Sequence, residues 1–248
     1  MKQWQSEGLV LRIRPYRESD KLVTLFTLQE GKVPALARGA RKTGSKLSGV
    51  VDSFCRGDYL LYRGRSLATI QQASVLEGFN GIREDIPLYF SALYLCELLE
   101  KVLEEHHPAP AVYSLTLEAL YAFNEGEASR ELVLRSFELL LLQELGYSPS
   151  LSGCVECCRQ EPPFVLSPAA GGLLCRECLG KERGLNLSSG SIALMQRILT
   201  RGLPAMKVVR APAGQLKELN RVSWEFFLYN TDIKNIKSRT SLENLPRG

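Results

Sequence analysis

Two Cys-x-x-Cys pairs place the tightest limit on how this 248-residue chain can fold. Cys154 and Cys157 form the first pair, Cys175 and Cys178 form the second, and residues 158–174 lie between the pairs. This spacing is in the range of a four-thiolate zinc site, whose closed tetrahedron leaves no open position for catalysis. We therefore predict one structural zinc ion, held by these four cysteines in a zinc ribbon over residues 151–183.

A fifth cysteine, Cys158, follows the first pair directly. We interpret it as a spectator, because the pairing of Cys154 with Cys157 keeps the two-residue spacing that the geometry favours; whether Cys158 competes for the metal stays open. The alternatives for the whole module are redox-active thiols and reduced, metal-free thiols. The redox alternative is disfavoured because neither pair lies in a βαβ setting.

From the sequence we expect neither a membrane span nor a signal peptide. Its longest purely aliphatic run is Leu139 to Leu142, and charged residues interrupt the stretch from Met1 to Arg14. We expect a cytoplasmic protein, and a reducing compartment favours metal binding over disulfides when cysteines come in close pairs.

Residues 1–80 show the alternating pattern of short strands. The turn Gln29 to Lys32 contains Gly31, where a hairpin needs positive φ. The expected strands are Gly8 to Arg14, Lys21 to Leu28, Lys32 to Arg38, Asp58 to Tyr62 and Ala68 to Leu76. Five short strands predict an OB-fold barrel, although an SH3-like barrel has a similar pattern.

Helical periodicity replaces this pattern after Pro87. Gly146 stands where the residue after a helix belongs, and the tail after Asp232, with Lys234, Lys237 and Arg239, is expected to be loose. The expected helices are Leu88 to Glu105, Val112 to Phe123, Arg130 to Leu145, Ile192 to Thr200 and Leu216 to Tyr229. Five glutamates are interpreted as solvated faces of helices: Glu97, Glu100, Glu104, Glu118 and Glu138.

The predicted fold class is therefore α+β and multidomain. Residues 1–80 form an OB-fold domain, to which the basic residues considered below assign DNA binding, and residues 81–150 form the first part of a helical core domain. The zinc ribbon of residues 151–183 is inserted there, and residues 184–248 form the second helical part with a basic tail.

Charge is segregated along the chain. Residues 1–80 carry 13 Lys and Arg against 7 Asp and Glu, residues 81–150 carry 4 against 12, and residues 151–248 carry 14 against 8. The net charges are therefore +6, −8 and +6. Two basic regions around an acidic one indicate a polyanion binder, although charge alone is also compatible with three solvated surfaces.

The basic residues of the presumed barrel are candidates for DNA contact, since they are interleaved with aromatic residues that can stack on bases. Most of those aromatics should nevertheless be core. The predicted DNA-binding residues are Arg12, Arg14, Lys21, Lys32, Arg38, Arg41, Lys42, Lys46 and Arg56. The strongest candidates are the four between Arg38 and Lys46, which lie on a loop with Gly and Ser where charge is not needed for packing.

No catalytic constellation can be assembled from the sequence. The segment Gly39 to Lys46 departs from a phosphate-binding loop, because the lysine and the hydroxyl residue are transposed and no helix start follows. A zinc deaminase would need His-x-Glu ahead of Pro-Cys-x-x-Cys, and no Gly-x-Ser-x-Gly elbow is present. We predict that the protein is not an enzyme.

With these residues in view, the chain resembles the RecO family over almost its whole length. One departure is Cys158, where the family often has glycine. The likeness is carried by Gly8-Leu-Val-Leu-Arg12 with Tyr16, Glu18, Asp20 and Leu22 to Thr27; by Ala37-Arg-Gly-Ala-Arg-Lys42 with Ser45; by Leu145-Gly-Tyr-Ser-Pro149; and by Gly171-Gly-Leu-Leu-Cys175 with both cysteine pairs.

The resemblance implies an N-terminal OB-fold, a helical core and an inserted zinc ribbon. It also implies a recombination mediator in DNA repair that binds single-stranded and double-stranded DNA and anneals complementary strands. Its implied partners are RecR, the acidic C-terminal tail of the single-strand-binding protein (SSB) and, indirectly, RecA, at the nucleoid. The alternative is a zinc-ribbon nucleic-acid-binding protein of transcription or RNA handling, which would bind nucleic acid without annealing strands or competing for the SSB tail.

Overall fold

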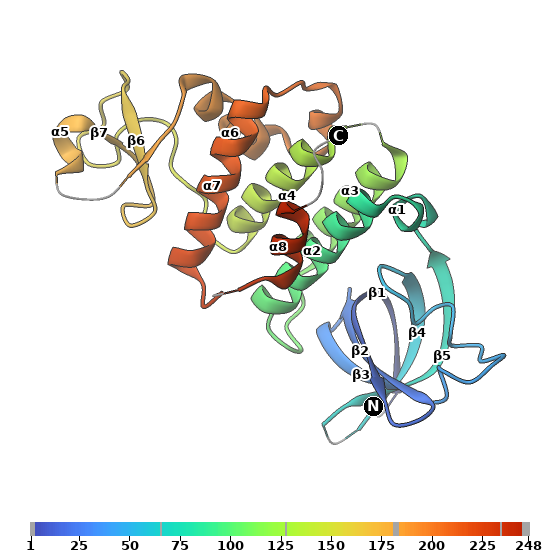
Figure 1. Cartoon of the computed structure of the whole chain (residues 1–248). Coiled ribbons are helices and arrows are strands. Elements are labelled where there is room, and N and C mark those ends of the chain that lie inside the picture. The colour runs from blue at the N-terminus through green and yellow to red at the C-terminus, as the bar shows by residue number, and fades with distance from the viewer. Residues whose placement is uncertain (1–2, 65, 127, 181–183, 234, 245–248) are drawn as a thin grey trace. The chain divides into compact units, whose positions relative to one another are not determined.

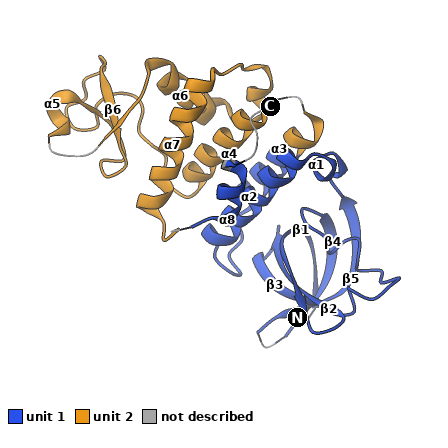
Figure 2. Ribbon diagram, in the orientation of Figure 1, with its two compact units in different colours: residues 1–120, 235–248 blue, residues 121–234 orange. Residues whose placement is uncertain are grey.

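The computed structural model describes residues 3–64, 66–126, 128–180, 184–233 and 235–244, and its elements are shown in Figure 1. By their internal contacts, the residues form two compact units (Figure 2). One unit contains residues 1–120 together with 235–248, and the other contains residues 121–234. No described helix is both long enough and apolar enough to span a bilayer.

Five strands of the first unit close into a barrel in the order β1-β2-β3-β5-β4. β1 pairs antiparallel with both β2 and β4, and a short parallel pairing of β3 with β5 completes the ring. The strands are β1 (Gln3–Tyr16), β2 (Asp20–Thr27), β3 (Gly31–Ala37), β4 (Arg56–Arg63) and β5 (Ala68–Glu77). The predicted N-terminal OB-fold is confirmed.

The interior of the barrel follows from strand alternation. In β3 the buried Val33, Ala35 and Ala37 alternate with half-buried residues, so one face of the strand lines the core. Tyr59 of β4 is fully buried, and its hydroxyl donates a hydrogen bond to the carbonyl of Val50 at 3.1 Å. Gly31 has φ +67, as the turn between β2 and β3 requires.

An ion pair joins β1 to β4. The Nε and Nη2 atoms of Arg56 donate to the two carboxylate oxygens of Glu7 at 2.8 and 3.0 Å, and the hydroxyl of Tyr113 donates to the same carboxylate at 2.9 Å. The pKa of Glu7 is lowered, chiefly because the Arg56 guanidinium stabilises the charged form. The network ties α3 (Pro110–Glu125), which contributes Tyr113, to the barrel wall.

The expectation of a loose C-terminal tail is wrong for its described part. Lys237–Glu243 form α8, which contacts α2 (Ile86–Val102) within the first unit. Glu97 of α2 accepts hydrogen bonds from the backbone N–H groups of Lys237 and Ser238 at 3.0 and 2.9 Å, so it caps α8 instead of facing solvent. Lys234 lies outside the described residues. The short α1 (Asn80–Glu84) precedes α2, which ends at Val102, before the predicted Glu105.

The second unit contains a helical part and a small sheet. Its helices are α4 (Arg130–Glu144), α6 (Ser189–Arg201), the 3-10 helix η1 (Pro204–Val208) and α7 (Ala213–Asn230). Its sheet has the order β7-β6-β8, with β6 (Phe164–Ser167), β7 (Gly172–Cys175) and β8 (Leu185–Asn186), and the short α5 (Arg176–Leu179) follows β7. Gly146, with φ +83, follows α4 as predicted.

The expectation that Glu138 lies on a solvated helix face is wrong, because this residue is fully buried. It lies on α4, where it accepts a hydrogen bond from Nη1 of Arg135 at 2.8 Å and one from the hydroxyl of Ser223 on α7. The same Arg135 nitrogen donates to the amide oxygen of Asn220. A buried charge is tolerated when it is paired and hydrogen-bonded, and this network joins α4 to α7.

We expect Glu7→Gln to lower the free energy of unfolding by about 1–2 kcal/mol, because it removes the charge that pairs with Arg56. The pKa of Glu7 is depressed in the folded state, so this contribution is present above its ordinary value of 4.5 and is lost as the pH falls through the lower folded value. Urea unfolding at pH 7 and at pH 3 measures both effects.

The control is Glu144→Gln, which removes an exposed carboxylate at the end of α4. A Glu7→Gln protein that keeps wild-type stability at pH 7, or that loses as much at pH 3 as at pH 7, would show that the ion pair contributes nothing to the fold.

Candidate metal centre and nucleic-acid interface

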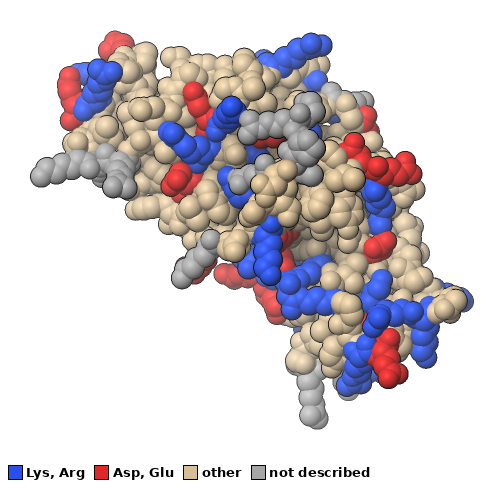
Figure 3. Space-filling model, viewed as in Figure 1, with Lys and Arg blue, Asp and Glu red and all other residues tan. Residues whose placement is uncertain are grey.

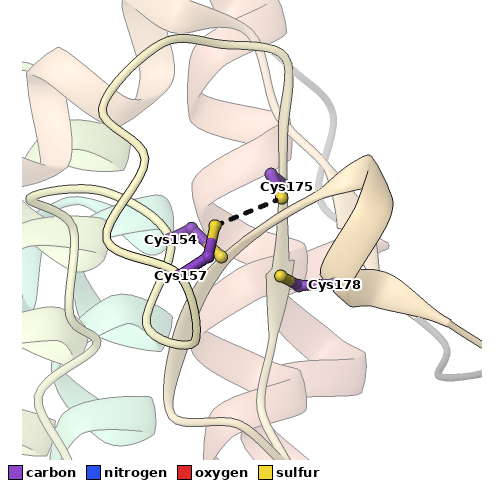
Figure 4. Close-up of side chains that lie close together, drawn as sticks. All are labelled: Cys154, Cys157, Cys175 and Cys178. Carbon is purple, nitrogen blue, oxygen red and sulfur yellow. Dashed lines mark hydrogen bonds between the residues drawn. The ribbon is translucent and has the colours of Figure 1, made fainter.

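The four predicted cysteine ligands converge in the second unit. Their Sγ atoms all lie within 4.8 Å of one another, and those of Cys157 and Cys175 are 3.7 Å apart. Figure 4 shows the four side chains pointing toward a common centre, two from the loop before β6 and two from the end of β7 and from α5. Zinc–sulfur bonds of about 2.3 Å place the sulfurs of a tetrahedral site about 3.8 Å apart, so this arrangement fits a four-thiolate metal centre.

The two cysteine pairs have the same local geometry. In each pair the first sulfur, of Cys154 or Cys175, is buried and receives the backbone N–H of the second cysteine of the pair. This hydrogen bond is the main reason that the pKa of Cys154 is lowered to about 6, and it lowers the pKa of Cys175 as well.

The other two cysteines, Cys157 and Cys178, are more exposed, and the pKa of each thiol is raised. The pKa of Cys178 is raised to about 12, chiefly because its thiol shares hydrogen bonds with Cys157 and Cys175. Four thiolates at this separation would repel one another in the absence of a cation. The donor set therefore favours a divalent metal that prefers sulfur, and it offers no open position for a water molecule.

Backbone pairing fixes the first cysteine loop against β7. The N–H of Leu173 donates to the carbonyl of Ser150 at 3.0 Å, and the N–H of Val155 donates to the carbonyl of Leu173 at 2.8 Å. Gly172 permits this approach, since a Cβ atom there would lie 2.7 Å from the carbonyl oxygen of Ser150. The second pair is joined to the first by Arg159, whose guanidinium makes a bidentate ion pair with Glu177 at 3.0 and 2.9 Å.

Cys158 stands outside the cluster of four sulfurs. Its side chain is exposed, and its φ of +60 lies in the left-handed region that favours glycine. Its backbone N–H donates to the carbonyl of Cys154 at 2.9 Å, which closes the first cysteine loop. The turn therefore needs the backbone conformation at this position and not the thiol.

The basic residues between Arg38 and Lys46 lie on the loop that connects β3 to β4. We name residues 38–48 the basic loop. Figure 3 shows Lys and Arg side chains gathered over the barrel on the face in view. The four predicted loop residues are all exposed, and none forms an ion pair among the described residues: Arg38, Arg41, Lys42 and Lys46. Arg14 near the end of β1 is exposed as well.

The other four residues predicted to contact DNA are engaged within the first unit. Nη1 of Arg12 donates to both carboxylate oxygens of Glu100 at 2.8 and 2.9 Å, and Nζ of Lys32 donates to the carbonyl of Glu100 at 2.7 Å. Arg56 pairs with Glu7 as described above, and Nζ of Lys21 donates to the carbonyl of Val51 at 2.9 Å. These contacts serve the fold, and DNA contact by these residues stays a prediction.

Two residues next to the basic loop belong to the same surface, although they are absent from the predicted set: Arg17 in the β1–β2 turn (residues 17–19) and Asp20 at the start of β2. The guanidinium of Arg17 lies 5.2 Å from the ring centroid of Tyr16, and its carbonyl accepts a hydrogen bond from Nη1 of Arg41 at 3.1 Å. A carboxylate oxygen of Asp20 accepts the backbone N–H of Gly39 at 2.8 Å. No sequence motif links the β1–β2 turn to the loop after β3. Their proximity follows from the pairing of β2 with β1 and with β3.

Family models match nearly the whole chain. Residues 1–79 match the model described as recombination protein O N terminal, and residues 83–240 match the model described as recombination protein O C terminal.

Named relatives agree with the family models. The DNA repair protein RecO of Symbiobacterium thermophilum is 35% identical over 244 residues, which is 96% of each chain. That of Syntrophomonas wolfei is 38% identical and covers 90% of this chain and 88% of its own. That of Exiguobacterium sibiricum is 43% identical over 69% of each chain.

We expect the purified protein to contain one zinc ion per chain after expression in zinc-replete medium, because four thiolates at tetrahedral spacing bind this ion tightly. Cys175→Ser should lose most of the metal and unfold the module, whereas Cys158→Ser and Cys158→Gly should keep it. Elemental analysis and circular dichroism measure the two effects. A metal-free wild-type protein, or a disulfide between the pairs, would contradict the assignment.

Proposed function

This chain belongs to the RecO family, and on that premise we propose that it acts in DNA repair as a DNA-binding recombination mediator. It binds single-stranded and double-stranded DNA and anneals complementary strands. Together with RecR it helps to load RecA onto single-stranded DNA that is covered by SSB, whose acidic C-terminal tail it recognises. It works in the cytoplasm at the nucleoid, and it has no catalytic centre of its own.

One observation carries this proposal: the basic loop on the OB-fold barrel is exposed, whereas Arg12, Lys21, Lys32 and Arg56 are held in contacts within the first unit. A barrel of this kind presents a rigid framework from which loops reach nucleic acid. Four cations on one solvent-exposed loop cost little folding energy, and their charge is available to phosphates. Contacts of this type bind the backbone of any sequence, which suits a protein that acts wherever DNA is damaged.

The same chemistry supports strand annealing. Two complementary strands repel each other through their phosphates, and a cationic protein surface lowers this repulsion because its Lys and Arg side chains neutralise phosphate charge, with release of counterions. A surface that contacts phosphates leaves base edges accessible for pairing. Single strands and duplex therefore bind the same surface, and the paired product does not have to be recognised by its sequence.

The cysteine module contributes to this function through structure. A closed four-thiolate zinc site has no position for substrate, so we propose that zinc folds the module and takes no part in a reaction. The ion then stabilises a unit that is too small to hold a large hydrophobic core of its own.

We expect the quadruple substitution of Arg38, Arg41, Lys42 and Lys46 by alanine to weaken binding to single-stranded and duplex DNA of any sequence. Each lost phosphate contact should flatten the slope of log K against log salt by about 0.7 on single strands. Fluorescence anisotropy with a labelled oligothymidylate over a range of salt concentrations measures both quantities. Zinc content and thermal unfolding should stay unchanged.

The matched control removes four cations from the second unit by substituting Arg197, Arg201, Lys207 and Arg210 with alanine. This variant should keep most of the affinity and the salt slope. If the control loses affinity and the loop variant does not, the DNA site lies in the second unit and the basic loop is only a solvated surface.

We expect the loop variant to anneal complementary oligonucleotides more slowly than the wild type, in proportion to its lost affinity, because annealing depends on the neutralisation of phosphates. A fluorescence-quenching assay with and without SSB measures the rate. A loop variant with impaired binding and a wild-type annealing rate would separate the two activities and would contradict their common surface.

A further inference from the structure

Asp20 stands in the middle of the basic surface, where a negative charge opposes the binding of phosphates. It is the first residue of β2, and the positive charges of Arg17 and Arg38 are close enough to stabilise its carboxylate. Electrostatics alone therefore predicts that its removal should strengthen binding to DNA. Its hydrogen bonds suggest the opposite effect.

The carboxylate of Asp20 holds the start of the basic loop. One oxygen accepts the backbone N–H of Gly39 at 2.8 Å, and the same oxygen accepts the hydroxyl of Ser19 at 3.1 Å. Gly39 has φ +65, so the chain turns sharply at this point, and its carbonyl accepts the N–H of Lys42 at 3.0 Å. The bond from Asp20 therefore orients the turn that presents Arg41 and Lys42.

Two further hydrogen bonds connect the basic loop with the β1–β2 turn. The backbone N–H of Arg41 donates to the carbonyl of Ser19 at 2.9 Å, and the Arg41 side chain donates to the carbonyl of Arg17. Downstream, the N–H groups of Ser45 and Ser48 donate to the carbonyls of Lys42 and Ser45 at 3.1 Å each. The basic loop is therefore a series of hydrogen-bonded turns that begins at Gly39, the residue that Asp20 holds.

The neighbour of Asp20 holds the chain just after the basic loop. Lys21, whose side chain is half-buried, donates to the carbonyl of Val51 at 2.9 Å, and Val51 is fully buried in the barrel core. Two adjacent side chains at the start of β2 therefore hold Gly39 and Val51, and the segment between them carries three of the four exposed cations. A loop fixed at both ends loses less conformational entropy when it binds a ligand.

We propose that Asp20 is a positioning residue for DNA binding: its carboxylate presets the basic loop for phosphate contact, and this effect outweighs the repulsion between its charge and DNA. The inference rests on the proposed function of the basic loop. It predicts that an acidic residue in a cationic surface increases the affinity for a polyanion.

Asp20→Ala should lower the affinity for a labelled oligothymidylate about tenfold, although it makes the protein more positive. Glu18→Ala is the matched control, because Glu18 is an exposed carboxylate in the same turn and makes no hydrogen bond among the described residues. This control should bind DNA as tightly as the wild type or more tightly. In contrast to Asp20→Ala, the variant Asp20→Asn should keep its affinity for DNA, since the amide oxygen of asparagine can accept the N–H of Gly39 without the negative charge.

A second measurement tests the loop without DNA. Trypsin should cleave after Arg38, Arg41 and Lys42 faster in Asp20→Ala than in the wild type, with Asp20→Asn and Glu18→Ala resembling the wild type. Thermal unfolding of all variants establishes that the barrel is intact. If the Asp20→Ala barrel is unfolded, Asp20→Ser replaces it in both measurements, because the shorter serine side chain removes the carboxylate that accepts the N–H of Gly39.

The outcomes separate the two proposals. If the four-alanine loop variant weakens binding but Asp20→Ala binds as tightly as Glu18→Ala, the loop contacts DNA and Asp20 does not position it. If Asp20→Ala exposes the loop to trypsin while neither it nor the loop variant changes the affinity, the positioning is real and the DNA site of the proposed function is wrong. Asp20→Ala in the background of the loop variant should cause no further loss, because its effect acts through the same cations.

Discussion

The antiparallel register of β2 against β3 is the constraint on which the candidate DNA surface depends. This register pairs Lys21 with Ala37, and the register of β1 with β2 pairs Tyr16 with Asp20. The chain that leaves β3 therefore begins beside the β1–β2 turn. A shift of one residue would move the alternate side chains of β2 from the core to the surface, and it would take Gly39 away from Asp20. Packing of the barrel core thus fixes the geometry of a loop that itself contributes few buried side chains.

Long-range pairing decides which cations remain available to a ligand. The segment 1–80 carries a net charge of +6, but Arg12 is paired with Glu100 from the acidic part of the chain. Arg56 is paired with Glu7. The charge segregation of the sequence is therefore partly compensated within the first unit. The positive charges of the basic loop are not compensated in this way, since no acidic residue forms an ion pair with them among the described residues.

Local patterns could be predicted from the sequence, because their causes are local. The spacing of Cys154, Cys157, Cys175 and Cys178 predicts their convergence, and alternation predicts the five strands of the barrel. Other features depend on partners far along the chain. Glu138 on α4 is buried because Ser223 on α7 donates to it, and Glu97 on α2 caps α8 near the end of the chain. Neither partner can be identified from periodicity, which predicts that both glutamates are solvated.

Hydrogen–deuterium exchange of the wild-type protein with and without oligothymidylate tests the central claim most directly, since it reports on each segment without substitution. The account predicts that DNA slows exchange in residues 38–48 and in the β1–β2 turn, with little change on α6 and α7, whose hydrogen bonds are already within helices. Slower exchange confined to residues 189–230, with none in the basic loop, would contradict it.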